Sequence, residues 1–477
     1  MNLKKRCTEG IKNPFCLAIF SVLLCLAAPA LSAQETETQA KRLSPDEAVE
    51  MAIKNNLSLE SARTGTATKK RASDLSWNQF IPNVTLGAGI INDDSRTYLH
   101  NESDIPSMIL DQMREQLETT RWGIAGQIQT SLTISVAMFE NMKRLRLDYE
   151  GGLISYEKAK AQLERDVRKS YHNMLLLQEN IALLQLSVEN VDRQVQMALA
   201  NYDAGLAPEL TYLQARVARE NLRPTVDQAE NGLKLSMAQF AMYLGLDYNT
   251  PFELVPISEN MDFIPLDVSE MISKASNGKP DIQELRQTIL MLQSARKAQS
   301  NSLLPALSLS WNMTPFFFLK PKPETNMAES KFNPAANVSS QFSIMLGVRL
   351  HSLIPYSTDS QAIKNLDDQI TTANIGLAQL IRGTEIEVYN TVLALERTRI
   401  SAEAQAQTVS LAEQSYRLTE EAYRAGLQDY FQVQSAEQSL RQARVQMLEQ
   451  QFKYLNGLID LEYSTGVPFG TLSTRSR

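Results

Sequence analysis

The chain has 477 residues, of which 43% are hydrophobic and 21% charged, with only 19 Gly and 18 Pro. This composition excludes a disordered or collagen-like chain. All three Cys lie within the first 25 residues, and the three His (His100, His172 and His351) are far apart in sequence. Residues for thiolate or imidazole metal sites and for His-based catalysis are therefore scarce, which disfavours an enzyme.

The N-terminus has the pattern of a secretory signal peptide. Basic residues between positions 4 and 12 precede an apolar run over 15–28, and small residues follow up to Ala33. The run is shorter than the roughly 20 residues of a membrane-spanning helix, so we expect residues 1–33 to be cleaved as a signal peptide. Lipidation of Cys25 is a weaker alternative, because the bulky Leu24 precedes it.

The charge balance argues against a nucleic-acid partner. The formal net charge is −7, and loss of residues 1–33 makes the chain more acidic, because that segment carries four basic residues and one acidic residue. No later stretch approaches 18 continuous apolar residues. Any contact with a membrane must therefore use β-strands or a segment lying on the surface.

Two sets of landmarks recur at nearly the same offset. The triplet Ala-Gly-Leu around Gly205 recurs around Gly426, 221 residues later, and the segment after Pro82 resembles the segment after Pro305, 223 residues later. Matched landmarks in the same order predict an internal duplication. We expect a first repeat over 34–255 and a second over 256–477.

The first half predicts a helix, two strands and a long helix in that order. Ser44 followed by Pro45 and acidic residues is typical of a helix start. Pro82 ends the helical region, a strand is expected to about Ile91, and a second strand begins at Trp122. In this second strand, apolar residues (Ile124, Ile128, Leu132, Ile134) alternate with Gln, Ser and Thr.

The second half repeats these elements. Alternation predicts one strand over 307–313 and another over 342–350, separated by a Pro-containing loop over 320–336. An antiparallel sheet of a soluble protein, with one buried face, produces the same alternation. The alternation alone therefore does not distinguish a soluble sheet from transmembrane strands, and the neighbouring elements are needed to choose between them.

Each half also predicts a very long helix. No proline occurs between Pro106 and Pro208, and apolar residues step by three and four through this stretch. A helix of about 60 residues would be roughly 90 Å long. Each long helix reaches an Ala-Gly-Leu turn and returns as a shorter helix, so we expect two coiled-coil hairpins that are too long and too charged to lie within a bilayer about 30 Å thick.

The strands have the length that transmembrane barrels use. Trp77, Trp122 and Phe316 lie near their ends, where the aromatic girdle of such a barrel is found. Four strands cannot close a barrel, since bacterial examples begin at about eight. If these strands lie in lipid, the chain must form an oligomer.

The duplicated order of elements, the glycine turn in each half and the Ile-Pro-Asn-Val and Leu-Pro-Ala-Leu strand starts resemble the TolC-like outer-membrane efflux protein family. The resemblance covers about residues 43–466. It implies an α+β membrane protein: a homotrimer with a 12-stranded transmembrane β-barrel, four strands per chain, continued by a long α-helical coiled-coil barrel across the periplasm. The periplasmic end opens when an inner-membrane pump of the RND or ABC class docks through a periplasmic adaptor protein.

In this family the glycine turns lie at the periplasmic tip, where the adaptor binds. By the resemblance, the tip residues are Tyr202, Gly205, Leu206, Leu213, Ala215, Tyr423, Gly426, Leu427 and Ala436. A simpler interpretation is that each Gly only supplies the positive φ that ends a helix.

The candidate constriction departs from the family pattern. Members often carry aspartates after the second Gly, and this chain has Gln432 and Ser435 there. Glu209 and Asp429 lie nearer the turns and are candidates for an acidic ring, although solvated loop carboxylates are the plainer interpretation. The charge selectivity of the gate stays open.

These patterns predict a passive outer-membrane duct of a tripartite efflux or type I secretion system, with no cofactor, metal or covalent chemistry. The exported substrate, whether drug, metal, lipid or protein, is not predicted. One alternative is a periplasmic coiled-coil tether or adaptor without a channel. A weaker one is an adhesin that exposes loops over 92–121 and 319–340.

Overall fold

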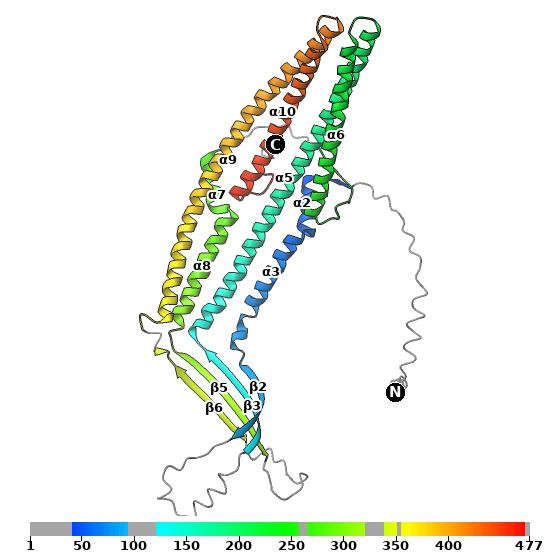
Figure 1. Cartoon of the computed structure of the whole chain (residues 1–477). Helices are drawn as coiled ribbons and strands as arrows, with labels where there is room; N and C mark the ends of the chain where they lie inside the picture. The colour runs from blue at the N-terminus through cyan, green and yellow to red at the C-terminus, as the bar shows by residue number, and fades with distance from the viewer. Residues whose placement is uncertain (1–40, 94–120, 257–264, 320–337, 351–353, 473–477) are drawn as a thin grey trace, which may run out of the picture. The chain divides into compact units, whose positions relative to one another are not determined.

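The computed structural model describes residues 41–93, 121–256, 265–319, 338–350 and 354–472 (Figure 1). Up to residue 254 the elements are β1 (Lys41–Leu43), α2 (Pro45–Asn55), α3 (Leu57–Asp74), the short 3-10 helix η1 (Ser76–Phe80), β2 (Asn83–Asp93), β3 (Arg121–Ile134), α5 (Val136–Asp203), α6 (Glu209–Tyr243) and β4 (Phe252–Leu254). From residue 268 they are α7 (Val268–Gly278), α8 (Pro280–Asn301), β5 (Ala306–Leu319), β6 (Val338–Gly347), α9 (Thr358–Arg424) and α10 (Tyr430–Thr465). The series of two shorter helices, two strands, a long helix and a return helix therefore occurs twice.

The chain divides into two units. The described residues of the smaller unit are 41–42 and 251–253, and in it Arg42 and Glu253 form an exposed ion pair with Nε and Oε2 3.3 Å apart. β1 pairs with β4 in a two-stranded sheet. The larger unit holds every other described residue, including the long helices and a four-stranded sheet.

The first helix begins where the sequence predicts. The Ser44 hydroxyl accepts the backbone N–H of Glu47 at 3.3 Å, and a Glu47 carboxylate oxygen accepts the backbone N–H of Ser44 at 2.9 Å. This reciprocal pair is a capping box, which satisfies two otherwise unpaired donors of the first turn. Asn56 then separates α2 from α3 and accepts the N–H groups of Ser58 and Leu59.

The structure confirms two helical hairpins. α5 has 68 residues and α9 has 67, and their return helices α6 and α10 have 35 and 36. At 1.5 Å per residue α5 is about 100 Å long. α5 packs against α6, α9 packs against α10, and α10 also packs against α5 (Figure 1). None of the described helices is both long and apolar enough to cross a membrane.

Each return helix ends at a glycine that touches the end of a shorter helix. Gly245 after α6 and Gly466 after α10 both have φ +68°. A Cβ atom on Gly466 would collide with the backbone of Gly278, and one on Gly245 would collide with the backbone of Asn55. Both positions therefore require glycine twice over, for the backbone conformation and for the close approach.

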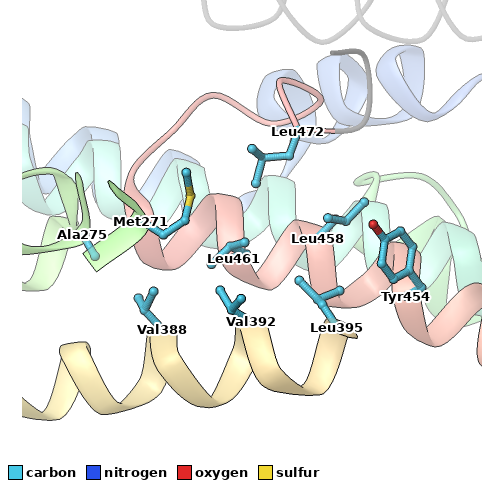
Figure 2. Close-up of a cluster of buried hydrophobic side chains, with 9 residues drawn as sticks. All are labelled: Met271, Ala275, Val388, Val392, Leu395, Tyr454, Leu458, Leu461 and Leu472. Atoms are coloured by element: carbon cyan, nitrogen blue, oxygen red, sulfur yellow. The ribbon is translucent and has the colours of Figure 1, made fainter. Parts of the chain in front are cut away.

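A hydrophobic cluster surrounds the root of the second hairpin. It joins α7, α9 and α10, and Leu472 from the C-terminal end of the chain is buried in it (Figure 2). The buried members are Met271, Ala275, Val388, Val392, Leu395, Tyr454, Leu458, Leu461 and Leu472. The Glu462 carboxylate accepts the backbone N–H groups of Gly470 and Leu472 at 3.0 and 2.8 Å, so it holds residues 467–472 against α10.

Polar links connect the two halves of the chain. On α5, the Lys158 ammonium lies 2.6 Å from an Asp281 oxygen and 2.8 Å from a Glu284 oxygen, both on α8. Partial burial opposes the charged form, but the two carboxylates prevail and raise the pKa of Lys158 above its usual range. Within the second half, Lys279 binds Glu387 of α9 at 2.5 Å, and Glu387 accepts the Ser464 hydroxyl of α10.

The four strands form one antiparallel sheet in the order β2-β3-β5-β6. The predicted strand over 342–350 is shifted in the structure, where β6 covers Val338–Gly347, because it pairs with β5 from Ala306 to Pro315. Pro315 has no N–H group to donate to the β3 ladder. It lies against Gly126, where a Cβ atom would come within 2.9 Å of the proline ring, so the missing side chain makes room for the ring.

Substitutions at Gly426 and Gly466 distinguish the cost of backbone strain from the cost of a steric collision. Gly426→Ala at the second hairpin turn adds a Cβ in open space at φ +69°, so we expect a loss of about 1–2 kcal/mol. Gly466→Ala adds the same strain and a collision with Gly278, so its loss should be larger. Thermal unfolding followed by circular dichroism measures both variants. Equal shifts in midpoint would contradict the contact described at the hairpin root.

Candidate functional site

The first hairpin turn is a regular helix-ending motif. α5 ends at Asp203, and Gly205 adopts φ +75°. The N–H of Leu206 donates to the carbonyl of Asn201 at 2.8 Å, and the N–H of Gly205 donates to that of Tyr202 at 2.9 Å. This pair of bonds defines a Schellman motif. Pro208 follows directly before the first turn of α6.

The second turn repeats the first. Gly426 has φ +69°, and the N–H groups of Leu427 and Gly426 donate to the carbonyls of Ala422 and Tyr423 at 2.9 and 3.0 Å. Asp429 then caps α10, since its carboxylate accepts the N–H of Gln432 at 3.0 Å. Both glycines therefore have the conformational role expected from the sequence.

The predicted tip residues divide by exposure. Leu206 and Leu427 are each 79% exposed, which is unusual for leucines in an ordered turn. Leu213 and Tyr202 are also exposed, whereas Ala215 and Tyr423 are buried. Ala436 is half-buried. The candidate constriction residues Glu209, Asp429, Gln432 and Ser435 are all exposed.

The buried tip residues join the two hairpins. Tyr423 on α9 and Ala215 on α6 belong to one hydrophobic cluster, whose other buried members are Val191, Val195, Ala198, Tyr430 and Val433. The rings of Tyr423 and Tyr430 meet edge to face with centroids 6.3 Å apart. Tyr430 and Val433 were not predicted, because they lie on α10, across the Gly426 turn from Tyr423, where helical spacing gives no signal.

Two phenol groups in this cluster are buried without a partner. The hydroxyls of Tyr423 and Tyr430 have no hydrogen-bond partner among the described residues. Burial, followed by the nearby Tyr423 and Glu437, raises the pKa of Tyr430 to about 12. Glu437 itself is buried and accepts the Ser187 hydroxyl of α5 at 2.7 Å. The contact between the hairpins thus combines apolar packing with incompletely satisfied polar groups.

The four-stranded sheet has one apolar and one polar face. Register partners share a face, so the alternation along each strand lines up across the sheet. One face carries Val84, Leu86, Ala88, Ile90, Ile128, Leu132, Ile134, Leu307, Leu309, Trp311, Met313, Phe342, Ile344 and Leu346. The other carries Asn83, Thr85, Gln127, Gln129, Ser131, Thr133, Ser308, Ser310, Asn312, Thr314, Ser339, Gln341 and Ser343.

The apolar face is uncovered. The exposed fraction is 78% for Leu86, 74% for Ile90 and 63% for Ile344. A sheet of a soluble protein normally buries its apolar face against a second layer. β2 and β6 lie at the two ends of the strand order, so each also has a free edge within one chain. Within the described residues the sheet therefore lacks both a layer over its apolar face and partner strands at its two edges.

The predicted aromatic girdle is described only in part. Trp77 lies in η1, before the first strand of the sheet, and is 53% exposed. The backbones of Trp122 and Phe316 lie in β3 and β5, and their side chains are outside the description. The loops suggested for an adhesin fall almost entirely on residues 94–120 and 320–337, which are also outside it. Among the residues that the structure describes, no group of three or more His, Cys, Asp or Glu is placed to hold a metal ion.

This arrangement of helices and strands is the fold of outer-membrane channels. The chain is similar to the CmeC outer membrane channel of Campylobacter jejuni, with a TM-score of 0.71 and 14% identity over 88% of this chain and 85% of that one. It is similar to CusC with a TM-score of 0.71 and 15% identity over 89% of this chain and 92% of that one. It is also similar to the open state of the Neisseria gonorrhoeae MtrE outer membrane channel, with a TM-score of 0.66 and 13% identity over 89% of this chain and 89% of that one.

A family model matches part of the chain. Residues 48–246, which run from α2 to the end of α6, match the model of the outer membrane efflux protein family. This match and the shared fold confirm the resemblance inferred from the motifs. No significant match was found among curated protein sequences.

The unpaired phenol at the tip provides a test of the packing between the hairpins. Tyr430→Phe removes a buried hydroxyl that has no partner, so we expect it to stabilise the protein by about 1 kcal/mol. Tyr430→Ala leaves a cavity and should cost about 3–5 kcal/mol. Thermal unfolding compares both with Tyr202→Phe, whose hydroxyl-bearing side chain is half exposed and should be neutral. A destabilised Tyr430→Phe would show that the hydroxyl is hydrogen-bonded.

Proposed function

We propose that this protein is an outer-membrane channel-tunnel, the passive exit duct of a tripartite efflux or secretion system. The observation that carries the proposal is the four-stranded sheet, whose apolar face and two edges are open while its other face is polar. A transmembrane barrel has this pattern, with apolar residues toward lipid and polar residues toward the lumen. The matched family and the shared channel fold support it.

The lateral order of the elements supports closure into a ring. α9 contacts α10 and α8, both of which contact α5, and α5 contacts α6 and α3. The sheet follows the same order, since β6, β5, β3 and β2 are joined to α9, α8, α5 and, through η1, α3. One side of the chain thus ends in β6 and α9, and the other in β2, α3 and α6. Two different sides that pair head to tail form a ring when the rotation between successive copies closes.

Apolar stripes on both sides fit this pairing. On α9 the exposed apolar residues follow a helical spacing along the helix and comprise Ile375, Ile386, Tyr389, Leu393, Ile400, Leu411 and Leu418. On α6 they comprise Leu210, Leu213, Val217, Leu235, Met242 and Tyr243. Extended apolar stripes on long helices are typical of coiled-coil contacts. A second copy of the chain, which brings the complementary side, covers each stripe.

The number of copies follows from barrel closure together with the family resemblance. Four strands fall short of the roughly eight in the smallest bacterial barrels, so more than one copy is needed. The resemblance implies three, which gives a homotrimer with a 12-stranded barrel and a ring of long helices. Each chain then contributes two repeats, over 34–255 and 256–477, after loss of the signal peptide at 1–33.

The helices place most of the protein outside the lipid. α5 is about 100 Å long against a hydrocarbon thickness of about 30 Å, so it projects through water. A secreted chain with a barrel in the outer membrane places this helical part in the periplasm. The duct has no cofactor or catalytic group, and the pump supplies the energy. Docking of the partners opens it by favouring the open arrangement of the hairpins.

The hairpin tips are the proposed docking sites for the adaptor protein, which connects the duct to an inner-membrane pump of the RND or ABC class. Leu206 and Leu427 offer exposed apolar side chains on turns that the Schellman motifs hold rigid. Glu209, Asp429, Gln432 and Ser435 lie beside these turns on the exposed surface and are the candidates for the constriction.

Introducing a charge on each face of the sheet tests whether the apolar face contacts lipid. Ile344→Arg places a charge on the apolar face and should cost about 2–4 kcal/mol at the bilayer midplane, so the amount of membrane-inserted oligomer falls. Gln341→Arg lies on the polar face of the same strand and should insert normally. Flotation with lipid vesicles and resistance of the oligomer to heat measure the insertion. Equal behaviour of the two variants would contradict a lipid-facing apolar face and would favour a tether without a channel.

Paired substitutions test the tips. The double variant Leu206→Ser and Leu427→Ser removes the apolar side chains from both turns, so we expect weaker cross-linking to the adaptor and at least fourfold lower resistance of cells to an exported compound. The amount of oligomer should not change, because neither side chain is buried. Leu57→Ser is the matched control, since Leu57 is 82% exposed away from the tips. Unchanged export in the double variant would exclude these leucines from docking.

A further inference from the structure

The polar face of the sheet is arranged in rows across the strands. Register places Gln129 of β3 opposite Asn312 of β5, and Asn312 opposite Gln341 of β6, so three amide side chains occupy one level. The next level holds Ser131, Ser310 and Ser343, with the last two hydroxyls 2.7 Å apart. These rows present both hydrogen-bond donors and hydrogen-bond acceptors.

Every residue of this face whose side chain the structure describes is neutral. In the stretches 83–90, 125–134, 306–315 and 338–347, the face consists of Ser, Thr, Asn and Gln with a few Gly and Ala and Met345. Asp93 and Arg121 are register partners at the far end of the β2–β3 ladder, and their side chains lie outside the description. The formal charge of the described face is therefore zero.

The sign of the charges that line a passage decides which ions it favours. Rings of Asp or Glu attract cations and rings of Lys or Arg attract anions. Amides and hydroxyls instead offer both ends of a dipole, so they replace lost hydration for a solute of either sign. Within this row the Asn312 Oδ1 is buried and has no hydrogen-bond partner among the described residues, so the sheet itself does not use this acceptor.

We propose that the polar face of this sheet lines a charge-neutral passage that selects for neither cations nor anions, so the barrel admits small polar solutes of either charge. This inference rests on the proposed channel function. It assigns selection among solutes to the helical part and to the partner proteins. The amide row Gln129, Asn312 and Gln341 is the level at which solutes exchange water for protein hydrogen bonds.

Charged thiol reagents measure the local potential directly. The three native Cys lie within the predicted signal segment, so Gln129→Cys introduces a single thiol into the mature chain. We compare its reaction rates with a cationic and an anionic methanethiosulfonate in protein embedded in lipid vesicles. The ratio of the two rates should fall within about twofold of the ratio for a small free thiol. A ratio skewed by tenfold or more in either direction would overturn the proposal.

An isosteric charge provides the positive control. Asn312→Asp in the Gln129→Cys background adds one negative charge to the same row, so the cationic reagent should gain at least threefold over the anionic one. No gain would also overturn the proposal, because the row would then not share one passage.

Ile344→Cys tests the proposed channel separately from the neutrality of its passage. It lies on the apolar face and should react at least tenfold more slowly than Gln129→Cys with both reagents. Equal reactivity would contradict the proposed channel itself. A slow Ile344→Cys together with a skewed ratio at Gln129→Cys would leave the channel intact and remove only its neutrality.

Discussion

A four-stranded antiparallel sheet with a bare apolar face cannot be the finished structure of this chain. β2 and β6 each present a row of backbone donors and acceptors at a free edge, and side chains such as Leu86 and Phe342 stay exposed. Lipid can cover the apolar face but cannot supply partners for the backbone groups, so in a membrane the edges must pair with one another. The proposed barrel meets this constraint with a bilayer and further copies of the chain.

The helices follow the same lateral order as the strands, so they too need partners from further copies of the chain. Because β6 and α9 lie on one side and β2, α3 and α6 on the other, closing the sheet also brings the apolar stripes of α9 and α6 together. The glycine contacts at Gly245 and Gly466 fix the roots of the hairpins, while the tips meet through Tyr423 and Tyr430. Rigid roots and a less well satisfied tip contact fit the proposed duct, which opens at its far end.

Periodicity and landmarks predict most of this fold. The capping box at Ser44, the strand after Pro82 and the turns at Gly205 and Gly426 stand where the sequence places them, because each depends on local chemistry. The pairing of β1 with β4, the approach of Gly466 to Gly278 and the burial of Leu472 depend on residues far apart in sequence, and no local pattern encodes them. At the tips, the sequence predicted the turns but could not separate the exposed Leu206 from the buried Tyr423.

The central claim is that several copies must complete one sheet in lipid. Light scattering of the protein extracted from membranes, with the detergent contribution subtracted, measures the mass of the particle. The account predicts three chains per particle and loss of the protein from solution when the detergent is removed. A single chain that stays dispersed in detergent-free buffer would contradict it.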